Sequence, residues 1–186
     1  MRLIAGLGNY PAKYNGTRHN IGFDAIDAYL SHTSISPVWK KGHNGVYFKS
    51  KDVFFLKPYT YMNLSGNSVG DLIRYYNIEN DDVLVIHDEI DFPIGRIKIA
   101  RNRGSGGHNG VQSVINSIGK DFYRIRVGIR NEYYISERRS DFVLSAFNKS
   151  ELEELNDNVY PLVYKIIESF KKNNIDKIMN DVNKKN

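Results

Sequence analysis

The first residues that suggest chemistry are Thr17, Arg18, His19 and Asn20, which stand together ahead of an amphipathic run. A histidine has an ordinary pKa near 6.5, so its neutral ring can take a proton from water as a general base. One histidine of five is weak support by itself, because most histidines are structural or solvated. His19 becomes a candidate base only if other segments of the chain converge on it.

A general base needs a partner that orients its ring, and Asp88 is the best candidate in this chain. It follows the continuous apolar run 83–86, which is typical of a strand buried on both faces of a parallel sheet. We expect this strand to end at His87, Asp88 and Glu89, with His87 and Glu89 pointing away from Asp88. A carboxylate held there would fix the tautomer of His19, although a cap or surface carboxylate is an equal alternative.

Three asparagines, Asn9, Asn63 and Asn109, offer uncharged amide groups close to other predicted strand or loop ends. Amides of this kind polarise a carbonyl group or hold a substrate amide, as in an oxyanion hole. The glycine-rich segment 104–110 lets a ligand approach backbone amides at a helix start. Each asparagine alone is more often a turn or cap residue, and the glycine-rich segment alone fits a flexible loop.

Motifs of several other enzyme classes are incomplete. Residues 6–8 follow a strand, as in a dinucleotide-binding fingerprint, but Pro11 occupies the third glycine position. The glycine-rich segment lacks the Lys-Ser/Thr of a phosphate-binding P-loop, and Ser65 lacks the preceding glycine of a nucleophile elbow. Cysteine is absent, which excludes disulfides, thiolate zinc sites and a cysteine nucleophile.

The elements that must position these groups alternate between strands and helices. We expect strands at 2–7, 46–48, 53–56, 83–86, 96–100 and 123–129, and helices at 17–32, 65–76, 111–118 and 150–170. This alternation predicts an α/β fold, a single domain over 1–186 with a mostly parallel mixed central sheet and helices on both faces. Ligands bind beyond the carboxyl ends of such strands, so Asn9, residues 61–63 and Asp88 are expected to face one crevice.

Four local features complete the predicted architecture. Thr17 is expected to cap the first helix, and Ser150 with Glu153 fits a capping box. Pro161 is expected to start, kink or break the last long helical run. The polar segment 173–186 is expected to form one weak helix that frays.

The formal charge of +5 over 186 residues is unevenly distributed. Residues 92–120 contain lysines and arginines but no Asp or Glu, and more arginines follow up to Arg139. Two interpretations stay open, a solvated basic face or a surface that binds phosphates or nucleic acid.

No apolar stretch reaches the roughly 18 residues of a membrane span, and the apolar run at the N-terminus is too short for a signal peptide. We therefore expect a cytoplasmic protein that does not enter a membrane. No large apolar surface can be read from the sequence, so a monomer without an obligate protein partner is the default.

Taken together, these segments resemble bacterial-type peptidyl-tRNA hydrolases. The matching stretches are 6–9, Tyr14 with 17–22, 57–58 with 60–66, 87–91, 106–110 and 126–129. They occur in the family's order and spacing and cover the chain from Leu3 to about Phe147. The resemblance implies hydrolysis of the ester that joins a peptide to the 3′ end of tRNA, which frees the tRNA for reuse in translation, without a metal or cofactor.

The resemblance also implies a role for each site residue. His19 would activate water, Asp88 would hold His19 in its basic form, and Asn9 would discriminate an N-blocked peptidyl group from a free aminoacyl group. Asn63 and Asn109 would bind the substrate near the ester, with Asn109 also positioning the water. The contacts with the tRNA end and its phosphates would fall on Tyr14, Tyr61, Met62 and Arg126.

Two positions depart from the family pattern. Tyr10 and Pro11 stand where the family usually has Pro-Gly, which leaves the conformation of the loop after Asn9 open. Ala100 replaces a lysine that, with the residue matching Arg126, holds the tRNA 5′ phosphate. The residues that might take its place are Lys98, Arg101 and Arg103.

Two alternatives of other classes stay open. One is a non-catalytic RNA-binding module on the same fold, which would not require the set of His19, Asp88 and three asparagines. The other is a metal-dependent hydrolase that uses His87, Asp88 and His108.

Overall fold

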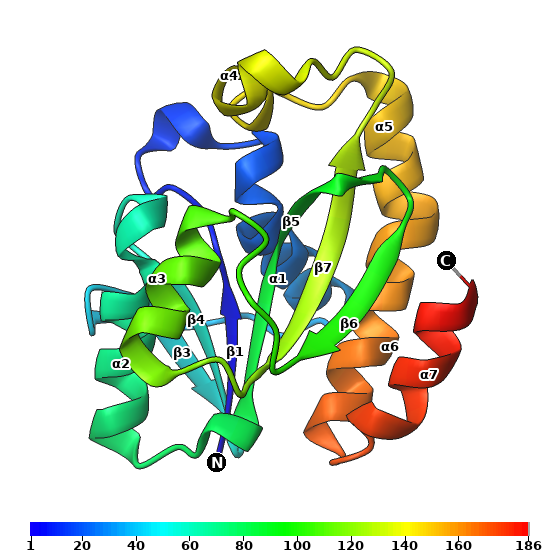
Figure 1. Ribbon diagram of the computed structural model, residues 1–186. Helices are drawn as coiled ribbons and strands as arrows, with labels where there is room; N and C mark the ends of the chain where they lie inside the picture. The colour runs from blue at the N-terminus through cyan, green and yellow to red at the C-terminus, as the bar shows by residue number, and fades with distance from the viewer. Residues whose placement is uncertain (186) are drawn as a thin grey trace.

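The computed structural model describes residues 1–185, which form one mixed sheet with helices on both faces (Figure 1). The seven strands have the spatial order β2-β3-β4-β1-β5-β7-β6. Their bounds are β1 Arg2–Gly6, β2 Lys40–Gly42, β3 Gly45–Ser50, β4 Val53–Pro58, β5 Val83–Pro93, β6 Ile97–Arg101 and β7 Tyr123–Arg130. Strands β4, β1, β5 and β7 run parallel, whereas β2, β3 and β6 are antiparallel to their neighbours. The predicted single-domain α/β fold is confirmed.

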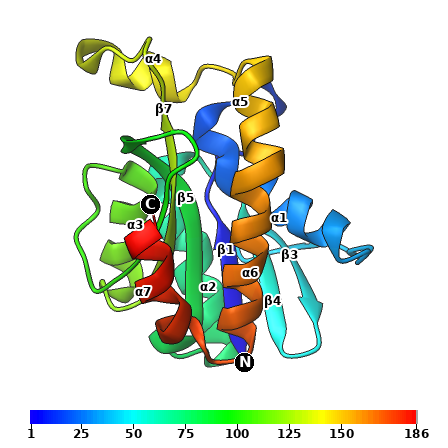
Figure 2. The ribbon, with the colours of Figure 1, turned by 90° about the vertical axis from the view of Figure 1, so that its right-hand side faces the viewer.

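The helices cover the two faces of the sheet in pairs. Their bounds are α1 Ile21–His32, α2 Ser65–Tyr76, α3 Asn109–Ile118, α4 Arg139–Val143, α5 Lys149–Glu154, α6 Tyr160–Lys171 and α7 Ile175–Lys185. Leu84 and Ile86 of β5 belong to the core under α1 and α6, while Val83 and Val85 belong to the core under α2 and α3. Figure 2 shows α5 and α6 running along one face, with α4 at the end opposite the N-terminus.

This arrangement follows from the alternation of side chains along each strand. An isoleucine or leucine side chain contributes about 1.5–3 kcal/mol when it is fully removed from water. Leu84, Ile86, Val83 and Val85 are all completely buried, so β5 needs helices on both faces. The prediction of a central parallel strand at this position is confirmed.

The predicted end of β5 was wrong. The strand continues through His87, Asp88 and Glu89 to Pro93, because its backbone keeps pairing with β7 up to Glu89 and again at Pro93. The pairing with β1 ends at Gly6, opposite Ile86, so from His87 onward β5 pairs with β7 alone. Backbone pairing, which the side-chain pattern does not report, decides the length of the strand.

The two predicted helix caps were also wrong. The hydroxyl of Thr17 donates to the Tyr14 carbonyl at 2.7 Å, and a short 3₁₀ turn, Arg18–Asn20, separates Thr17 from α1. The capping box at α5 consists of Asn148 and Glu151, with bonds of 2.9 and 2.7 Å. Each side chain accepts from the backbone amide of the other, so the helix begins before Ser150.

The interruption predicted near Pro161 is confirmed. A π-helical turn, Leu155–Val159, separates α5 from α6, and Pro161 stands in the first turn of α6. Proline has no backbone N–H, so the carbonyl four residues earlier cannot form its regular helical bond. The wider π turn accommodates the missing hydrogen bond, and the helical segment continues from α5 into α6.

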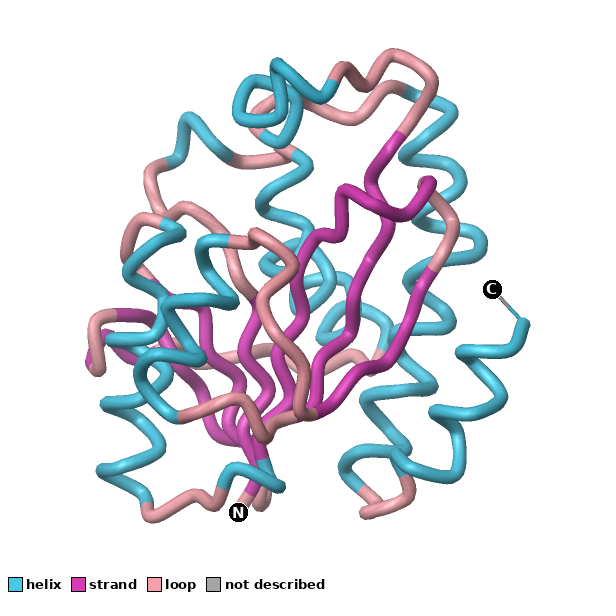
Figure 3. Tube along the Cα trace, in the orientation of Figure 1, coloured by secondary structure: helices cyan, strands magenta, loops and turns pink. Residues whose placement is uncertain are grey.

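The polar segment that follows contains α7, which lies beside the outer edge of β6 (Figure 3). Ile175 and Val182 are buried against the larger core. The Asn183 side chain bonds both the amide and the carbonyl of Ile99, at 2.9 and 3.0 Å. These bonds satisfy part of an edge strand that would otherwise be open to pairing with another chain. None of the helices in residues 1–185 is long and apolar enough to cross a membrane.

Candidate active site

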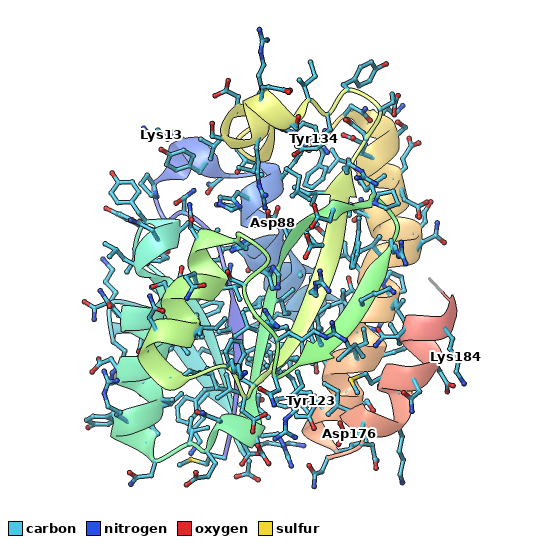
Figure 4. The ribbon with its side chains drawn as sticks, in the orientation of Figure 1. Lys13, Asp88, Tyr123, Tyr134, Asp176 and Lys184 are labelled. Atoms are coloured by element: carbon cyan, nitrogen blue, oxygen red, sulfur yellow. The ribbon has the colours of Figure 1, made fainter. Side chains whose placement is uncertain are left out.

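A cleft of about 640 Å³ is lined by residues that follow β1 and by residues of α4. Helix α4 lies beyond the carboxyl ends of the parallel strands (Figure 1). Seven of the residues predicted for the site line the cleft: Asn9, His19, Tyr61, Met62, Asn63, Asp88 and Asn109. Figure 4 labels Asp88 at this end of the sheet. The strand ends and the glycine-rich loop therefore meet at one crevice, in the place expected for an open parallel sheet.

His19 and Asp88 form a hydrogen-bonded pair in this cleft. His19 stands in the 3₁₀ turn before α1, and its Nδ1 atom lies 2.8 Å from Oδ1 of Asp88 on β5. Asp88 is 3% exposed and His19 is 14% exposed. The carboxylate only accepts hydrogen bonds, so Nδ1 carries the proton and Nε2 keeps its lone pair.

His108 is a second imidazole on the same carboxylate oxygen. Its Nε2 atom lies 2.8 Å from Asp88 Oδ1, and its Nδ1 atom accepts from the backbone amides of Gly110 and Val111 at 3.1 Å each. His108 thereby caps the start of α3, a role that amino-acid type alone does not suggest. These contacts assign the neutral form with the proton on Nε2.

The electrostatics of the cluster follow from burial and mutual contact. Burial acts to lower the pKa of His19, but the charge and hydrogen bond of Asp88 outweigh it, so the pKa is raised above its usual value. Burial would raise the pKa of Asp88, yet His19 and His108 hold it well below the ordinary range. Asp88 is therefore a permanent anion, and His19 is a stronger base than a free histidine.

Asn9 is held by contacts on both sides. Its backbone amide donates to Asn20 Oδ1 at 2.8 Å, and Asn20 Nδ2 returns a bond to the Asn9 carbonyl at 3.0 Å. Its side-chain oxygen accepts from the Met62 amide at 2.8 Å. This network joins the segments after β1 and β4 to the turn that carries His19. No role was expected for Asn20, although it belongs to the segment 17–20 that contains His19.

Comparisons with known proteins show the family of this chain. The sequence profile described as peptidyl-tRNA hydrolase matches residues 3–186. The peptidyl-tRNA hydrolase of Fervidobacterium nodosum is 42% identical, with 97% of this chain and 95% of that protein covered. That of Lawsonia intracellularis is 42% identical over 90% of this chain and 86% of its own length. The chain belongs to the peptidyl-tRNA hydrolase family.

The fold agrees as well. The crystal structure of peptidyl-tRNA hydrolase from Acinetobacter baumannii matches with a TM-score of 0.89 and 31% identity, covering 98% of this chain and 94% of that one. Membership of the peptidyl-tRNA hydrolase family makes this chain a hydrolase.

Two of the predicted substrate-binding residues lie outside the cleft. Tyr14 ends a 3₁₀ turn, and its ring lies 4.9 Å from Lys13 Nζ rather than against the cleft wall. Arg126 lies on β7, where Nε and Nη2 contact Glu89 Oε2 at 2.8 and 2.7 Å. Arg126 faces the side of the sheet opposite Ile125 and Val127, which belong to the core.

The three basic residues that might take the place of the family lysine at Ala100 differ in where they lie relative to Arg126. Ala100 pairs with Arg124 and is buried, while Lys98 pairs with Arg126 on the same face of β6 and β7. Arg101 points the other way, and Asp121 and Asp81 neutralise it. Arg103 is exposed in the loop, but Lys98 is the cation adjacent to Arg126.

The other family departure is the pair Tyr10 and Pro11. The Tyr10 amide donates to the Thr60 carbonyl at 3.3 Å, and the Tyr10 ring lies 5.1 Å from that of Tyr59. Pro11 leads into the 3₁₀ turn, with φ of −60°. The loop is therefore tied to the segment after β4, and it leaves Asn9 in the cleft.

One side of the cleft, formed by α4 and its flanks, contains none of the residues expected for the site. Arg139, Val143 and Leu144 line it, together with Ser136 and Glu137. This segment is short and mostly exposed, so it has no strong periodicity. Only the fold places it over His19.

Proposed function

We propose that this chain hydrolyses the ester bond of peptidyl-tRNA, with His19 as the general base and Asp88 as the residue that orients it. The observation that carries the proposal is the 2.8 Å bond between His19 Nδ1 and Asp88, which leaves Nε2 free as a base at the cleft. The raised pKa of His19 favours proton transfer from water near neutral pH.

The reaction begins when His19 Nε2 takes a proton from a water molecule. The water oxygen attacks the ester carbonyl carbon, and a negative charge develops on the carbonyl oxygen. The bond to the tRNA 3′ oxygen then breaks, and that oxygen receives the proton from His19. Asp88 stays ionised throughout and stabilises the imidazolium that forms between the two proton transfers.

The asparagines hold the substrate in this scheme. The Asn9 side-chain oxygen is engaged by the Met62 amide, so its Nδ2 atom is the group that donates to a carbonyl of the peptide. An N-blocked residue supplies such a carbonyl, whereas a free amino group does not. Asn63 and Asn109, which are exposed in the cleft, bind near the ester, and Asn109 also positions the water. Tyr61 and Met62 form the apolar wall for the terminal nucleotide.

The basic face of β6 and β7 binds the phosphates of tRNA. Lys98 and Arg126 are cross-strand neighbours there, and Arg126 and Arg96 lie 4.6 and 4.8 Å from the Phe92 ring. Such contacts fix orientation without reading base identity. Tyr14, outside the cleft, is a candidate contact for a more distant part of the tRNA end.

The hydrogen bonds of His108 argue against the metal-dependent alternative. Ligand atoms of His19, Asp88 and His108 do lie within 4.8 Å of one another. A metal on His108 Nε2 would require the proton to move to Nδ1, which already faces two backbone N–H donors. His87 turns its Nδ1 to the Asp88 carbonyl at 2.7 Å and is not in this group. A non-catalytic RNA-binding role gives no reason for a buried, oriented base.

A monomer in the cytoplasm, without a metal, cofactor or obligate protein partner, completes the proposal. Translation and its tRNA products are cytoplasmic.

The deciding experiment measures release of tRNA from N-acetyl-aminoacyl-tRNA and from the unblocked aminoacyl-tRNA, with a chelator present. We expect rapid release only from the blocked substrate. Equal release from both would contradict the role of Asn9. Release that the chelator abolishes would favour the metal-dependent reaction, and no release would exclude the hydrolase.

A further inference from the structure

Arg139 is a cation on the wall of the cleft that the reaction described so far does not use. It is the first residue of α4, it is half-buried, and it lines the cleft together with His19 and Asn109. The guanidinium lies close enough to the imidazole that its charge acts to lower the pKa of His19.

The guanidinium of Arg139 is held but not neutralised. Nη2 donates to the Gly106 carbonyl at 3.4 Å, and a side chain at Gly107 would begin 3.4 Å from Nη1. None of the ion pairs formed by residues 1–185 includes Arg139. The two nearest acids in the sequence are Glu137 and Asp141, and neither forms one of these ion pairs with Arg139; Glu137 accepts from Ser136 instead at 2.9 Å. Four of the five N–H donors are therefore available to a ligand.

The size of the cleft limits which part of the substrate can meet Arg139. About 640 Å³ corresponds to a small ligand, so only the reacting end of peptidyl-tRNA fits inside. The peptide need not carry a charge there. The terminal nucleotide always brings one anion, the phosphodiester on the same ribose that bears the ester.

We propose that Arg139 is a substrate-binding residue that holds the last phosphodiester group of the tRNA 3′ end, an inference that rests on the proposed function. A guanidinium matches the geometry of two phosphate oxygens and forms charge-assisted bonds with them. The hydrogen bond to the Gly106 carbonyl holds the guanidinium in position before the substrate binds. Arg139 thus acts inside the cleft, whereas Lys98 and Arg126 act on the outer sheet face.

The test uses two N-acetyl-aminoacyl-tRNAs that differ at one linkage. One carries the natural phosphodiester before the terminal nucleoside, and the other carries a neutral methylphosphonate there. With Arg139→Gln, measured on the high-pH plateau of the pH-rate profile, we expect kcat/KM to fall about tenfold or more for the natural substrate. For the neutral linkage we expect wild-type and variant to agree within about twofold.

The chain offers a matched control next to Arg139. Arg138 is an exposed arginine that does not line the cleft, so Arg138→Gln should leave both substrates unaffected. Arg139→Lys keeps the charge and should recover part of the loss.

Two results would overturn the proposal. An equal loss on both substrates would show that Arg139 acts through α4 or through His19, and no loss on either would show that it binds no part of the substrate. Failure of the wild-type protein to release tRNA from either substrate would instead contradict the proposed function itself.

Discussion

His19 and His108 share one oxygen atom of Asp88, with His19 Nδ1 and His108 Nε2 each 2.8 Å from Oδ1. Their ring centroids are 5.0 Å apart. The two rings differ in the environment of their second nitrogen. His108 Nδ1 accepts hydrogen bonds from backbone amides at the start of α3, whereas His19 Nε2 faces the cleft. One carboxylate thus orients two histidines, one whose second nitrogen is occupied and one whose second nitrogen faces the cleft.

Replacing His19 by asparagine should remove most of the chemistry and little of the binding. General-base catalysis contributes about 10²- to 10⁴-fold, so kcat for N-acetyl-aminoacyl-tRNA should fall by that factor. The tRNA affinity, measured by filter binding, should stay within about twofold, because the basic face of the sheet is unchanged. Full activity of His19→Asn would refute the mechanism.

The Asp88→Asn variant should move the pH-rate profile as well as lower its plateau. The negative charge of Asp88 raises the pKa of His19, so its removal lowers that pKa and shifts the acid limb to lower pH. The plateau should fall by about 10²-fold or more because the tautomer is no longer enforced. An acid limb that stays in place would contradict the pairing.

Removing the ring of His108 tests the shared carboxylate from the other side. In His108→Ala, Asp88 loses one of its two hydrogen-bond donors. Its negative charge then interacts more strongly with His19, because no second imidazole bonds the same oxygen. The acid limb of the pH-rate profile should therefore move to higher pH, the opposite direction from Asp88→Asn. Loss of the α3 cap should also lower the free energy of unfolding by about 1 kcal/mol. Shifts in the same direction for both variants would argue against this electrostatic account.

Neutralising Lys98 should weaken tRNA binding mainly at low salt. Lys98→Gln removes one phosphate contact, so the slope of log affinity against log salt should become shallower by about 0.7–0.9. Lys41→Gln, on the distant edge strand β2, is the matched control. Arg126 is less suitable because its removal leaves Glu89 buried without its cation. Identical salt slopes for Lys98→Gln and wild type would place the tRNA elsewhere.

Asp24 on α1 gives a prediction for stability. Burial is the main cause that raises the pKa of Asp24 to about 6, and the negative charge of Asp27 is the second cause. The positive charge of Lys57 acts in the opposite direction. A raised folded-state pKa means that its contribution to stability is complete below about pH 4 and is lost as the pH rises through about 6. Asp24→Asn should therefore increase the free energy of unfolding by about 2 kcal/mol at pH 8, and by much less at pH 4.

Urea titrations at the two pH values measure this difference. The exposed Asp181 on α7 provides the control, since Asp181→Asn should change stability by less than about 0.5 kcal/mol at either pH. Equal effects of Asp24→Asn at pH 4 and pH 8 would show that the carboxyl is not perturbed.

The order of elements could be predicted because it depends on local patterns. The apolar run 83–86 indicated a central strand, and the spacing of Val69, Leu72 and Ile73 indicated α2, both of which are present. Boundaries were less predictable where polar residues are buried with partners. His87 and Glu89 continue β5 because of backbone pairing, and Asn148 caps α5 because Glu151 reaches back to it.

The amino-acid sequence by itself determined the α/β fold and the placement of polar groups at strand ends. It also indicated His19 as the candidate general base. These depend on periodicity and on residue type, which are properties of neighbours in the chain. The tertiary structure decided which groups meet: His108 on Asp88, Asn20 on Asn9, and Arg139 across from His19. Contacts between residues far apart in the chain depend on how strands and loops cross in space, and no local pattern records that.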